Sequence, residues 1–203
     1  MTKLSDFIIR LRAMTHDERK IEYSDNEFIN YINDGVRFVR RVILDTYPSM
    51  LADMLLEGVL HANRDIIYLY DAPTRILSVK MNGKRLRQIN PLSEEEERKK
   101  RHGPTSYYVF GFDKIKIIPR PTFPMRFEVV GIEEFTPLKK PEDVLPIPVD
   151  FEDAVGEYAI LRASLTNEFN MQEEAQITMM IRSEIEERLK AFLPSGVQVE
   201  GYW

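Results

Sequence analysis

The spacing of hydrophobic residues changes twice along this chain of 203 residues, which predicts helices at both ends around a strand-rich middle. Apolar residues recur every three or four positions from 29 to 43 and again from 177 to 192, the repeat of one helical face. Between these stretches, short runs of β-branched and aromatic residues alternate with turn residues. The helix over 29–43 must end by Pro48, because proline cannot continue it.

Capping signals define where the long helices begin. Ser24 and Glu27 match a capping box, in which each residue binds the backbone N–H of the other. Gly35, inside the helix that follows, costs about 1 kcal/mol relative to alanine and is expected where a second helix crosses closely. Near the C-terminus, Asp150 is expected to cap another helix, with Glu152 in its positive first turn.

The strand-rich middle contains two hairpin signals. Asn82-Gly83 is the stronger, because both residues readily adopt the positive φ of a two-residue turn. A second turn is expected at Asp113-Lys114. We expect five or so short antiparallel strands that form a small sheet or an open barrel. The runs that predict them are 65–70, 75–81, 84–89, 107–112, 115–119 and 126–132.

These patterns together predict an α+β fold, in which a helical bundle formed by the N- and C-terminal helices carries an inserted antiparallel β-sheet or small open barrel. We expect residues 1–60 and 146–193 to form the helical bundle core. Residues 61–145 are then the β-rich insertion, and 194–203 an extended C-terminal tail. A chain of this length fits one domain with a sizeable insertion.

Composition argues against several classes of function. Cysteine is absent, so neither disulfides nor thiol chemistry is expected, and His16, His61 and His102 share no metal-ligand spacing. The chain lacks the blocks of a signal peptide and any apolar run near the ~20 residues that cross a bilayer, so we expect no membrane association. The formal charge of −5 opposes tight binding to phosphates.

Two acidic groups are the candidates for metal or acid–base chemistry. Glu94–Glu97 are consecutive on an expected helix and point in different directions, so a solvated face is favoured over a cation site. The second group resembles a two-metal site, but a helix cap with first-turn acids explains it more simply. We therefore expect no catalytic residue, no metal and no cofactor, with a metal-dependent hydrolase as a remote alternative. The second group is Asp150, Glu152, Asp153 and Glu157.

Arg162 falls on the apolar stripe of the helix after Asp150. A buried guanidinium needs a partner, because leaving it unpaired costs several kcal/mol. Asp34, on the helix over 29–43, is the expected partner. We predict a structural pair that holds two helices in register, in preference to a role in a functional site.

Aromatic residues of the second hairpin offer a different function. They alternate only partly, so both faces of the sheet carry aromatic rings, which could stack bases as in proteins that bind single strands. Few cations lie nearby in an acidic protein, so core packing and subunit contacts are favoured, and a single-stranded nucleic-acid-binding module remains the alternative. The aromatic residues are Tyr107, Tyr108, Phe110 and Phe112, and the cations are Lys114, Lys116 and Arg120.

The C-terminal tail is apolar and aromatic on an otherwise charged chain. Aromatic residues are favoured where one protein grips another, so the tail is expected either to anchor on a partner or to fold back into a groove of its own domain. Its anchors are Val197, Val199, Tyr202 and Trp203.

The order of these parts resembles the head-to-tail adaptor (connector, or head-completion) proteins of tailed bacteriophages. The resemblance covers most of the chain, and no single piece is an active-site signature. It is carried by residues 23–34, the hairpin 79–86, the hairpin 107–119 ending in Pro119-Arg120-Pro121, and the segments 145–155, 157–159 and 161–164.

The resemblance implies a structural virion protein, made in the host cytoplasm and located at the neck of the particle. Such proteins assemble as a ring, often of twelve subunits, below the portal protein after genome packaging. The ring retains the DNA, which passes through its lumen without sequence-specific binding, and provides a platform for tail or nozzle proteins. A C-terminal segment in similar proteins reaches the portal or a neighbouring subunit, which is the role expected for the tail. Simpler adaptors lack so elaborate a middle.

Overall fold

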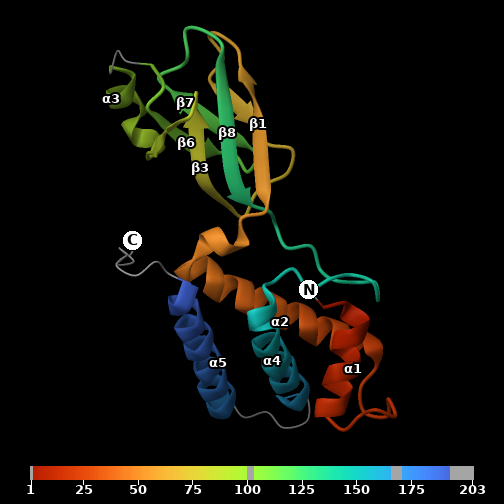
Figure 1. Cartoon of the computed structure of the whole chain (residues 1–203). Helices are drawn as coiled ribbons and strands as arrows, with labels where there is room; N and C mark the ends of the chain where they lie inside the picture. Colours follow the sequence, from red (N-terminus) through yellow and green to blue (C-terminus); the bar gives the residue numbers. More distant parts are fainter. Residues whose placement is uncertain (1, 100–102, 166–170, 193–203) are drawn as a thin grey trace. The chain divides into compact units, whose positions relative to one another are not determined.

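The computed structural model describes residues 2–99, 103–165 and 171–192 and divides the chain into two compact units. The helical unit comprises Met1–Leu51 and Phe135–Trp203, and the strand unit comprises Ala52–Glu134. Helices toward both ends and strands in the middle confirm a mixed α+β protein (Figure 1).

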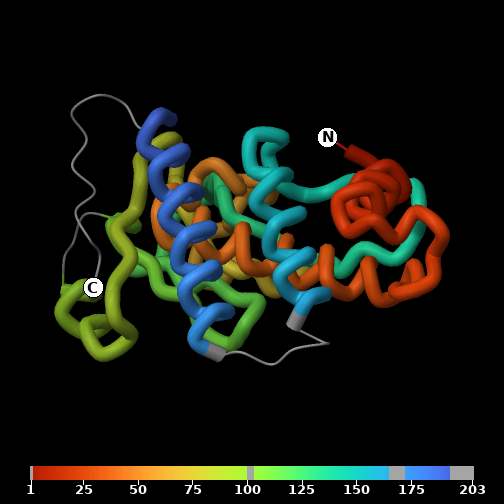
Figure 2. The backbone as a smooth tube through the Cα atoms, turned by 90° about the horizontal axis from the view of Figure 1, so that it is seen from below, coloured from red at the N-terminus to blue at the C-terminus, as the bar shows by residue number. Residues whose placement is uncertain are grey.

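Three helices of the helical unit, α1, α4 and α5, form a row that packs along a fourth helix, α2. In both backbone views α4 lies between α1 and α5, and all three pack along α2 (Figure 1, Figure 2). The two ends of the row are therefore α1 and α5. The elements are α1 (Leu4–Met14), α2 (Asp25–Thr46), α4 (Glu152–Leu165) and α5 (Met171–Phe192), with the 3-10 turns η1 (Pro48–Leu51) and η3 (Val149–Phe151).

The start of α2 and its close crossing with α4 confirm two predictions. The Glu27 amide donates to Ser24 Oγ at 3.3 Å, and the Ser24 amide donates to Glu27 Oε2 at 2.7 Å. A Cβ atom at Gly35 would lie 2.8 Å from the backbone oxygen of Val155 on α4. Glycine is therefore required by the approach of two backbones, which offsets its poor helix propensity.

The expected cap at Asp150 is wrong. Asp150 lies inside η3, whose N-cap is Pro148. Pro148 holds an extended backbone with ψ 143°, so the turn begins before the acidic residue and α4 follows directly from it.

The segment after the last strand belongs to the helical unit, which corrects the expected boundary at 145. Asn33 of α2 binds Leu138 twice: its Nδ2 donates to the carbonyl at 3.0 Å and its Oδ1 accepts from the amide at 2.8 Å. The Leu4 amide donates to the Asp143 carbonyl at 2.7 Å. Pro137 and Pro141 suggest an extended linker. The backbone polar groups of this segment nevertheless form hydrogen bonds with α1 and α2.

The strand unit contains two four-stranded sheets, and they do not close into a barrel. The first sheet has the order β1-β8-β3-β4, and the second has the order β2-β7-β6-β5. The first comprises β1 (Met54–Leu60), β3 (Arg75–Met81), β4 (Lys84–Arg85) and β8 (Met125–Ile132); the second comprises β2 (Ile66–Tyr68), β5 (Arg87–Gln88), β6 (Ser106–Phe110) and β7 (Lys114–Ile118).

The expected boundary at 60 is also wrong, because residues 54–60, which were expected in the helical bundle core, form strand β1 of the strand unit. This strand pairs antiparallel with β8, which lies far along the chain, and Gly58 faces Phe127 across the pair. Glycine disfavours a strand, but a Cβ atom here would lie 2.8 Å from the Phe127 ring. Phe127, which makes glycine suitable at this position, lies far along the chain, so the sequence around Gly58 does not reveal the contact.

Both predicted hairpins are present, with two changes. Asn82 and Gly83 take φ values of 48° and 77° between β3 and β4, and the turn between β6 and β7 falls at 111–113, slightly earlier than expected. The run 84–89 is not one strand: Leu86 is buried, and its amide donates to Val79 at 2.8 Å. The chain then crosses to the second sheet, where β5 pairs with β6 in parallel.

A hydrophobic core separates the inner faces of the two sheets. Because side chains alternate along a strand, the residues next to core positions point away from it. Tyr68, Lys114 and Phe110 are such neighbours on the outer face of the second sheet, and α3 (Glu94–Arg98) contacts β7 beside them. The core comprises Leu60, Ile67, Leu69, Val79, Met81, Leu86, Tyr107, Ile115, Ile117 and Val129.

Candidate functional site

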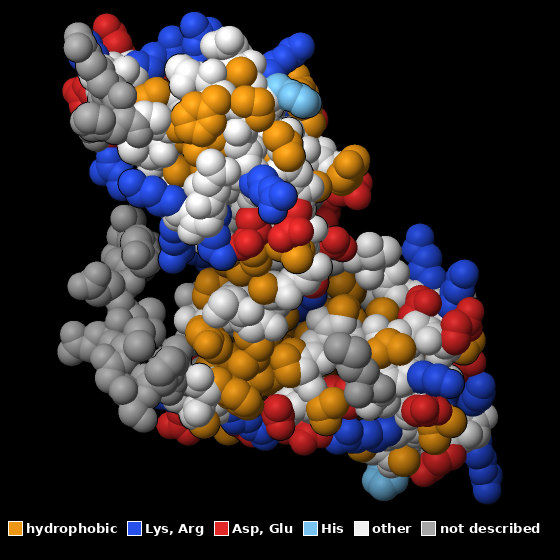
Figure 3. Space-filling view, turned by 45° about the horizontal axis from the view of Figure 1, so that its top comes forward, with side chains coloured by type: hydrophobic (Ala, Val, Ile, Leu, Met, Phe, Trp, Pro, Cys, Tyr) orange, Lys and Arg blue, Asp and Glu red, His pale blue; other side chains and the backbone are white. Residues whose placement is uncertain are grey.

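The helical unit exposes hydrophobic side chains at both ends of its row of helices. On α5, Met179 and Met180 are 69% and 70% exposed, whereas Ile181 and Ile185 are buried. At the other end of the row, Ile9 on α1 is exposed. Figure 3 shows one face of the molecule, where hydrophobic side chains reach the surface among charged ones. Large exposed apolar side chains that gather on one element indicate contact surfaces for other proteins.

Two further apolar residues are exposed at the α1 end of the row. Met14, at the C-terminal end of α1, and Ile21, in the loop, are both exposed. We call Ile9, Met14 and Ile21 the α1 surface, and Met179 and Met180 the α5 surface. The two surfaces belong to opposite ends of the helix row (Figure 2).

The predicted pair between Asp34 and Arg162 is replaced by two other pairs. Arg162 Nη1 lies 3.1 Å from Glu174 Oε1 on α5, and its side chain is 40% exposed. Asp34 Oδ1 instead lies 2.9 Å from Arg37 Nη1, one turn along α2. Because Arg162 is partly solvated, it does not need the buried partner that its apolar stripe suggested.

A buried ion cluster that the sequence analysis missed ties α1 to the start of α2. The guanidinium of Arg12 lies 2.7 Å from Asp17 Oδ2 and 2.6 Å from Asp25 Oδ1. It also donates to the Tyr23 carbonyl at 3.1 Å and sits 4.8 Å from the centre of the Phe28 ring. Arg12 therefore anchors the turn that joins α1 to α2.

Asp17 completes this cluster through the backbone. Its carboxylate accepts the amides of Ile21, Glu22 and Tyr23 at 2.7, 3.0 and 3.2 Å. The hydrogen bond from Glu22 is the main reason that the pKa of Asp17 lies below its usual value, against the opposing effect of desolvation. The two Nη atoms of Arg12 and the Asp17 carboxylate bind fixed parts of the fold, which favours a structural role, although the buried Arg12 Nε has no hydrogen-bond partner among the described residues.

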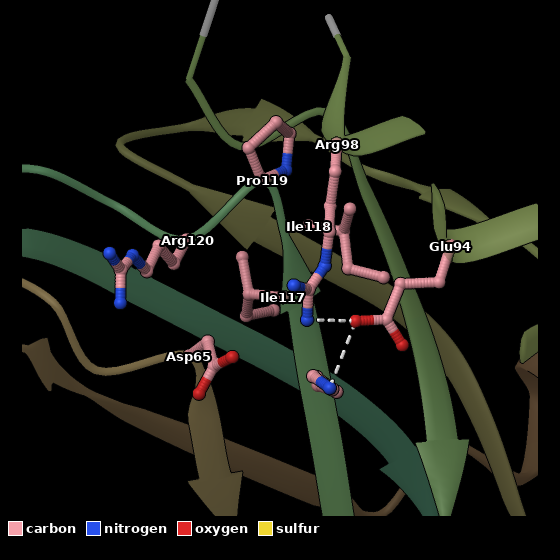
Figure 4. Close-up of a pocket in the computed structure, with 8 residues that line it drawn as sticks. Asp65, Glu94, Arg98, Ile117, Ile118, Pro119 and Arg120 are labelled. Atoms are coloured by element: carbon pink, nitrogen blue, oxygen red, sulfur yellow. Dashed lines mark hydrogen bonds and ion pairs between the residues drawn. The ribbon is translucent and has the colours of Figure 1, made fainter. Parts of the chain in front are cut away.

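A pocket of about 380 Å³ opens on the strand unit, beside β7 (Figure 4). Glu94 of α3 lies at its edge, 3.0 Å from Lys116 Nζ, and also pairs with Arg98. The Tyr108 hydroxyl donates to Glu94 Oε2 at 2.7 Å. The remaining charged residues of the pocket are Asp65 and Arg120, and its apolar part is Ile117, Ile118 and Pro119.

The environment of Glu94 makes it a strong acid. Burial by itself raises its pKa, but the hydrogen bonds from Tyr108, Lys116 and Arg98 outweigh burial and lower the pKa to about 2. Such a carboxylate is ionised throughout the physiological range and cannot serve as a general acid there. Its contacts make it a structural anchor for Lys116.

The expected solvated face at 94–97 is only partly correct. Glu97 is buried and lies 2.5 Å from Arg87, and it accepts from Ser106 Oγ at 3.0 Å. Only Glu95 and Glu96 of this run are exposed. The two inner carboxylates attach α3 to the second sheet, through partners that are distant in sequence.

The second acidic group is also divided among structural contacts. Glu152 accepts from the amide and hydroxyl of Thr2 at 3.1 and 2.6 Å, and Asp153 pairs with Arg10 of α1. No cluster of three potential metal-ligating side chains occurs within residues 2–99, 103–165 and 171–192. None of the helices in these ranges has the length and apolarity of a membrane span. The predicted anchors Val197, Val199, Tyr202 and Trp203 lie outside the described residues.

No protein-family model matches this chain, and no curated protein matches it significantly.

Proposed function

We propose that this protein is a head-to-tail adaptor of a tailed bacteriophage, a structural virion protein that forms a ring between the portal and tail proteins. The observation that carries the proposal is the position of the α1 and α5 surfaces at opposite ends of one row of helices. A ring is a closed set of head-to-tail contacts, in which every subunit offers one patch to each neighbour. Two separate apolar surfaces on one helical unit meet this requirement.

The chemistry of the two surfaces suits association. Methionine side chains are flexible and fit irregular surfaces. Burial of apolar side chains such as isoleucine contributes a favourable free energy of about 25 cal/mol per Å² of area removed from water. Near the α5 surface, Arg182 and Glu186 pair with each other at 2.8 Å, which leaves the methionines as the groups available for burial. We infer that the α5 surface of one copy packs on the α1 surface of the next.

The further elements of the proposal follow the resemblance. Twelve copies would surround the lumen through which the DNA passes, the helical bundle with its inserted sheet would form the wall, and Val197, Val199, Tyr202 and Trp203 would anchor the ring on the portal or on a neighbour. Deletion of 197–203 is expected to leave a folded protein that docks poorly on the portal. The protein makes and breaks no bond in this role.

A complementation experiment tests the head-to-tail contact. The variant Met179→Glu/Met180→Glu loses the α5 surface, and Ile9→Glu loses the α1 surface, because each places charge where apolar area is buried. The unmodified protein is expected to form rings, either by itself or with portal added, in mass photometry and negative-stain images. Under the same conditions, each variant alone is expected to remain monomeric.

Mixing the two variants distinguishes a head-to-tail contact from other geometries. The first variant retains its α1 surface and the second its α5 surface, so an equimolar mixture should form dimers that stop at one interface. Leu92→Glu, at an exposed apolar residue of the strand unit, is the control and should assemble normally. Rings formed by either variant alone, or a mixture without dimers, would contradict the proposal.

A further inference from the structure

The outer face of the second sheet carries an unusual arrangement of aromatic rings and cations. Tyr68 on β2, Lys114 on β7 and Phe110 on β6 are direct cross-strand neighbours. The Lys114 ammonium lies 5.9 Å from the centre of the Tyr68 ring and 5.8 Å from that of Phe110. One cation thus sits between two rings on a strand face, and its ammonium also lies 3.9 Å from Asp113 Oδ1, at the outer limit of an ion pair.

More aromatic surface lies at the same end of the sheet. Tyr70 follows β2 and Phe112 lies in the turn after β6, and they are 91% and 84% exposed. The Leu69 amide donates to the Asp113 carbonyl at 2.8 Å, which holds these two segments together. We call Tyr68, Tyr70, Phe110, Phe112 and Lys114 the aromatic face.

Basic side chains continue from the aromatic face along β7 to the pocket, although two of them, Lys116 and Arg98, pair with Glu94. Lys116 is the next outward residue of β7, and Ile66 and Tyr108 flank it in the following cross-strand row. Arg98 and Arg120 line the pocket beyond it (Figure 4). Arg120 has no carboxylate partner within the described part of the chain, so its charge is available to an anion.

The charge of the protein is divided unequally between its units. The strand unit, 52–134, holds 14 of the 28 Lys and Arg residues but only 12 of the 33 Asp and Glu residues, which gives it a formal charge of +2. The remaining residues carry −7. The acidic total that opposes phosphate binding therefore does not describe the strand unit.

We propose that the aromatic face binds single-stranded nucleic acid without sequence preference, with Tyr68, Tyr70 and Phe112 stacking on bases and Lys114 and Arg120 contacting phosphates. Aromatic platforms combined with cations along a backbone track are the means by which single strands are bound, and every base has a face that can stack. A base pair in a duplex hides that face, so the aromatic rings select unpaired strands.

The outer face of the first sheet is a matched contrast within the same unit. Leu55 and Val59 of β1 are exposed there, and Lys80 lies 2.5 Å from Glu128 across the sheet. This face has exposed apolar groups, and its lysine Lys80 pairs with a carboxylate and contacts no aromatic ring in the part of the chain that the structure describes. It is the natural control for the aromatic face.

Fluorescence anisotropy with a labelled oligothymidine of about 15 nucleotides tests the proposal. We expect saturable binding at low salt, weakened at least about tenfold by Tyr70→Ala/Phe112→Ala, because each lost stacking contact reduces affinity severalfold. Lys114→Gln should lower the slope of log K against log salt concentration by about 0.7. Leu55→Ala/Val59→Ala should bind as the unmodified protein does.

Four results would overturn the inference. The first is the absence of saturable binding at low salt, and the second is an unchanged affinity in Tyr70→Ala/Phe112→Ala. The third is equal competition by a duplex of the same length. The fourth is that the unmodified protein binds no oligonucleotide, while Tyr70→Ala/Phe112→Ala loses docking to tail proteins. The third would indicate phosphate contacts alone, and the fourth would assign the face to a protein partner. Because Tyr70 and Phe112 are exposed, circular dichroism should show that the variant keeps its fold.

Discussion

The helical unit and the strand unit differ in how they use charge. The helical unit buries it: Arg12 and Asp17 have side chains only 5% and 1% exposed, and their partners are fixed parts of the fold. The strand unit instead keeps cations at its surface, where Lys114 lies between rings and Arg120 lines a pocket. Buried pairs define one arrangement of helices, whereas surface cations remain able to bind an anion. In the two proposals, accordingly, the helical unit supplies the contacts for assembly and the strand unit supplies the surface for recognition.

The largest expected effect tests the buried pair of the helical unit. Arg12→Met leaves Asp17 without its cation, so the melting temperature of the helical unit should fall by about 10 °C or more. Thermal unfolding followed by circular dichroism at 222 nm measures this change.

Arg162→Met is the matched control, because it removes a guanidinium of the same unit that is 40% exposed and pairs with Glu174. Its melting temperature should change by no more than about 3 °C. A similar loss in both variants would show that burial does not distinguish the two arginines.

The next effect concerns acid stability of the strand unit. Because the folded-state pKa of Glu94 is lowered to about 2 from 4.5, its ionised form stabilises the fold above pH 4.5, and this contribution is lost as the pH falls toward 2. The contribution is about 2 kcal/mol at neutral pH, allowing for solvent screening at the pocket mouth.

Glu94→Gln should therefore be less stable than the unmodified protein at pH 7 and equally stable near pH 2. Urea unfolding at a series of pH values, followed by near-ultraviolet circular dichroism of the tyrosines, measures the difference. The neighbouring exposed residue provides a control in Glu95→Gln, which should keep the original pH dependence. If the free energy of unfolding of Glu94→Gln changed with pH in the same way as that of the unmodified protein, Glu94 would not be the source of this acid sensitivity.

The smallest effect compares two glycines of the helix row. Gly35→Ala places a Cβ atom 2.8 Å from the Val155 backbone oxygen, so we expect a net loss of about 1–2 kcal/mol despite the better helix propensity. At Gly156 the nearest atoms, on Leu11 and Phe7, lie 3.6 and 3.7 Å away, in ordinary contact. Gly156→Ala should therefore be neutral or stabilising by up to about 1 kcal/mol in urea unfolding. Equal effects at both positions would contradict the close α2–α4 crossing.

The sequence predicted local elements better than their partners. The capping box at Ser24 and the turn at Asn82 were both correct, because each depends on residues a few positions apart. Strand β1 was missed, since it pairs with a strand that lies far along the chain. The predicted partner of Arg162 is wrong for the same reason: an apolar stripe shows which face of a helix is covered, and not which carboxylate lies opposite.

The candidate surfaces follow the same division. The aromatic residues 107–112 were recognised, but only the structure separates buried Tyr107 from exposed Phe112 and brings Tyr68 and Tyr70 beside them. The overall charge of −5 suggested an acidic protein, and the division into units reveals a strand unit of +2. A net charge does not show where the charged side chains lie, whereas binding depends on the charges at the contacting surface.

By itself the sequence determined an α+β protein with long helices near both ends, two hairpins between them and a glycine that admits a helix crossing, since hydrophobic period, caps and turn residues act over a few positions. Only the tertiary structure decided that 135–145 packs on the helices, that Glu94 and Glu97 anchor α3, and that aromatic rings from β2 and β6 meet around Lys114. These results depend on side chains brought together across long stretches of chain, whose pairing is selected by the free energy of the whole fold.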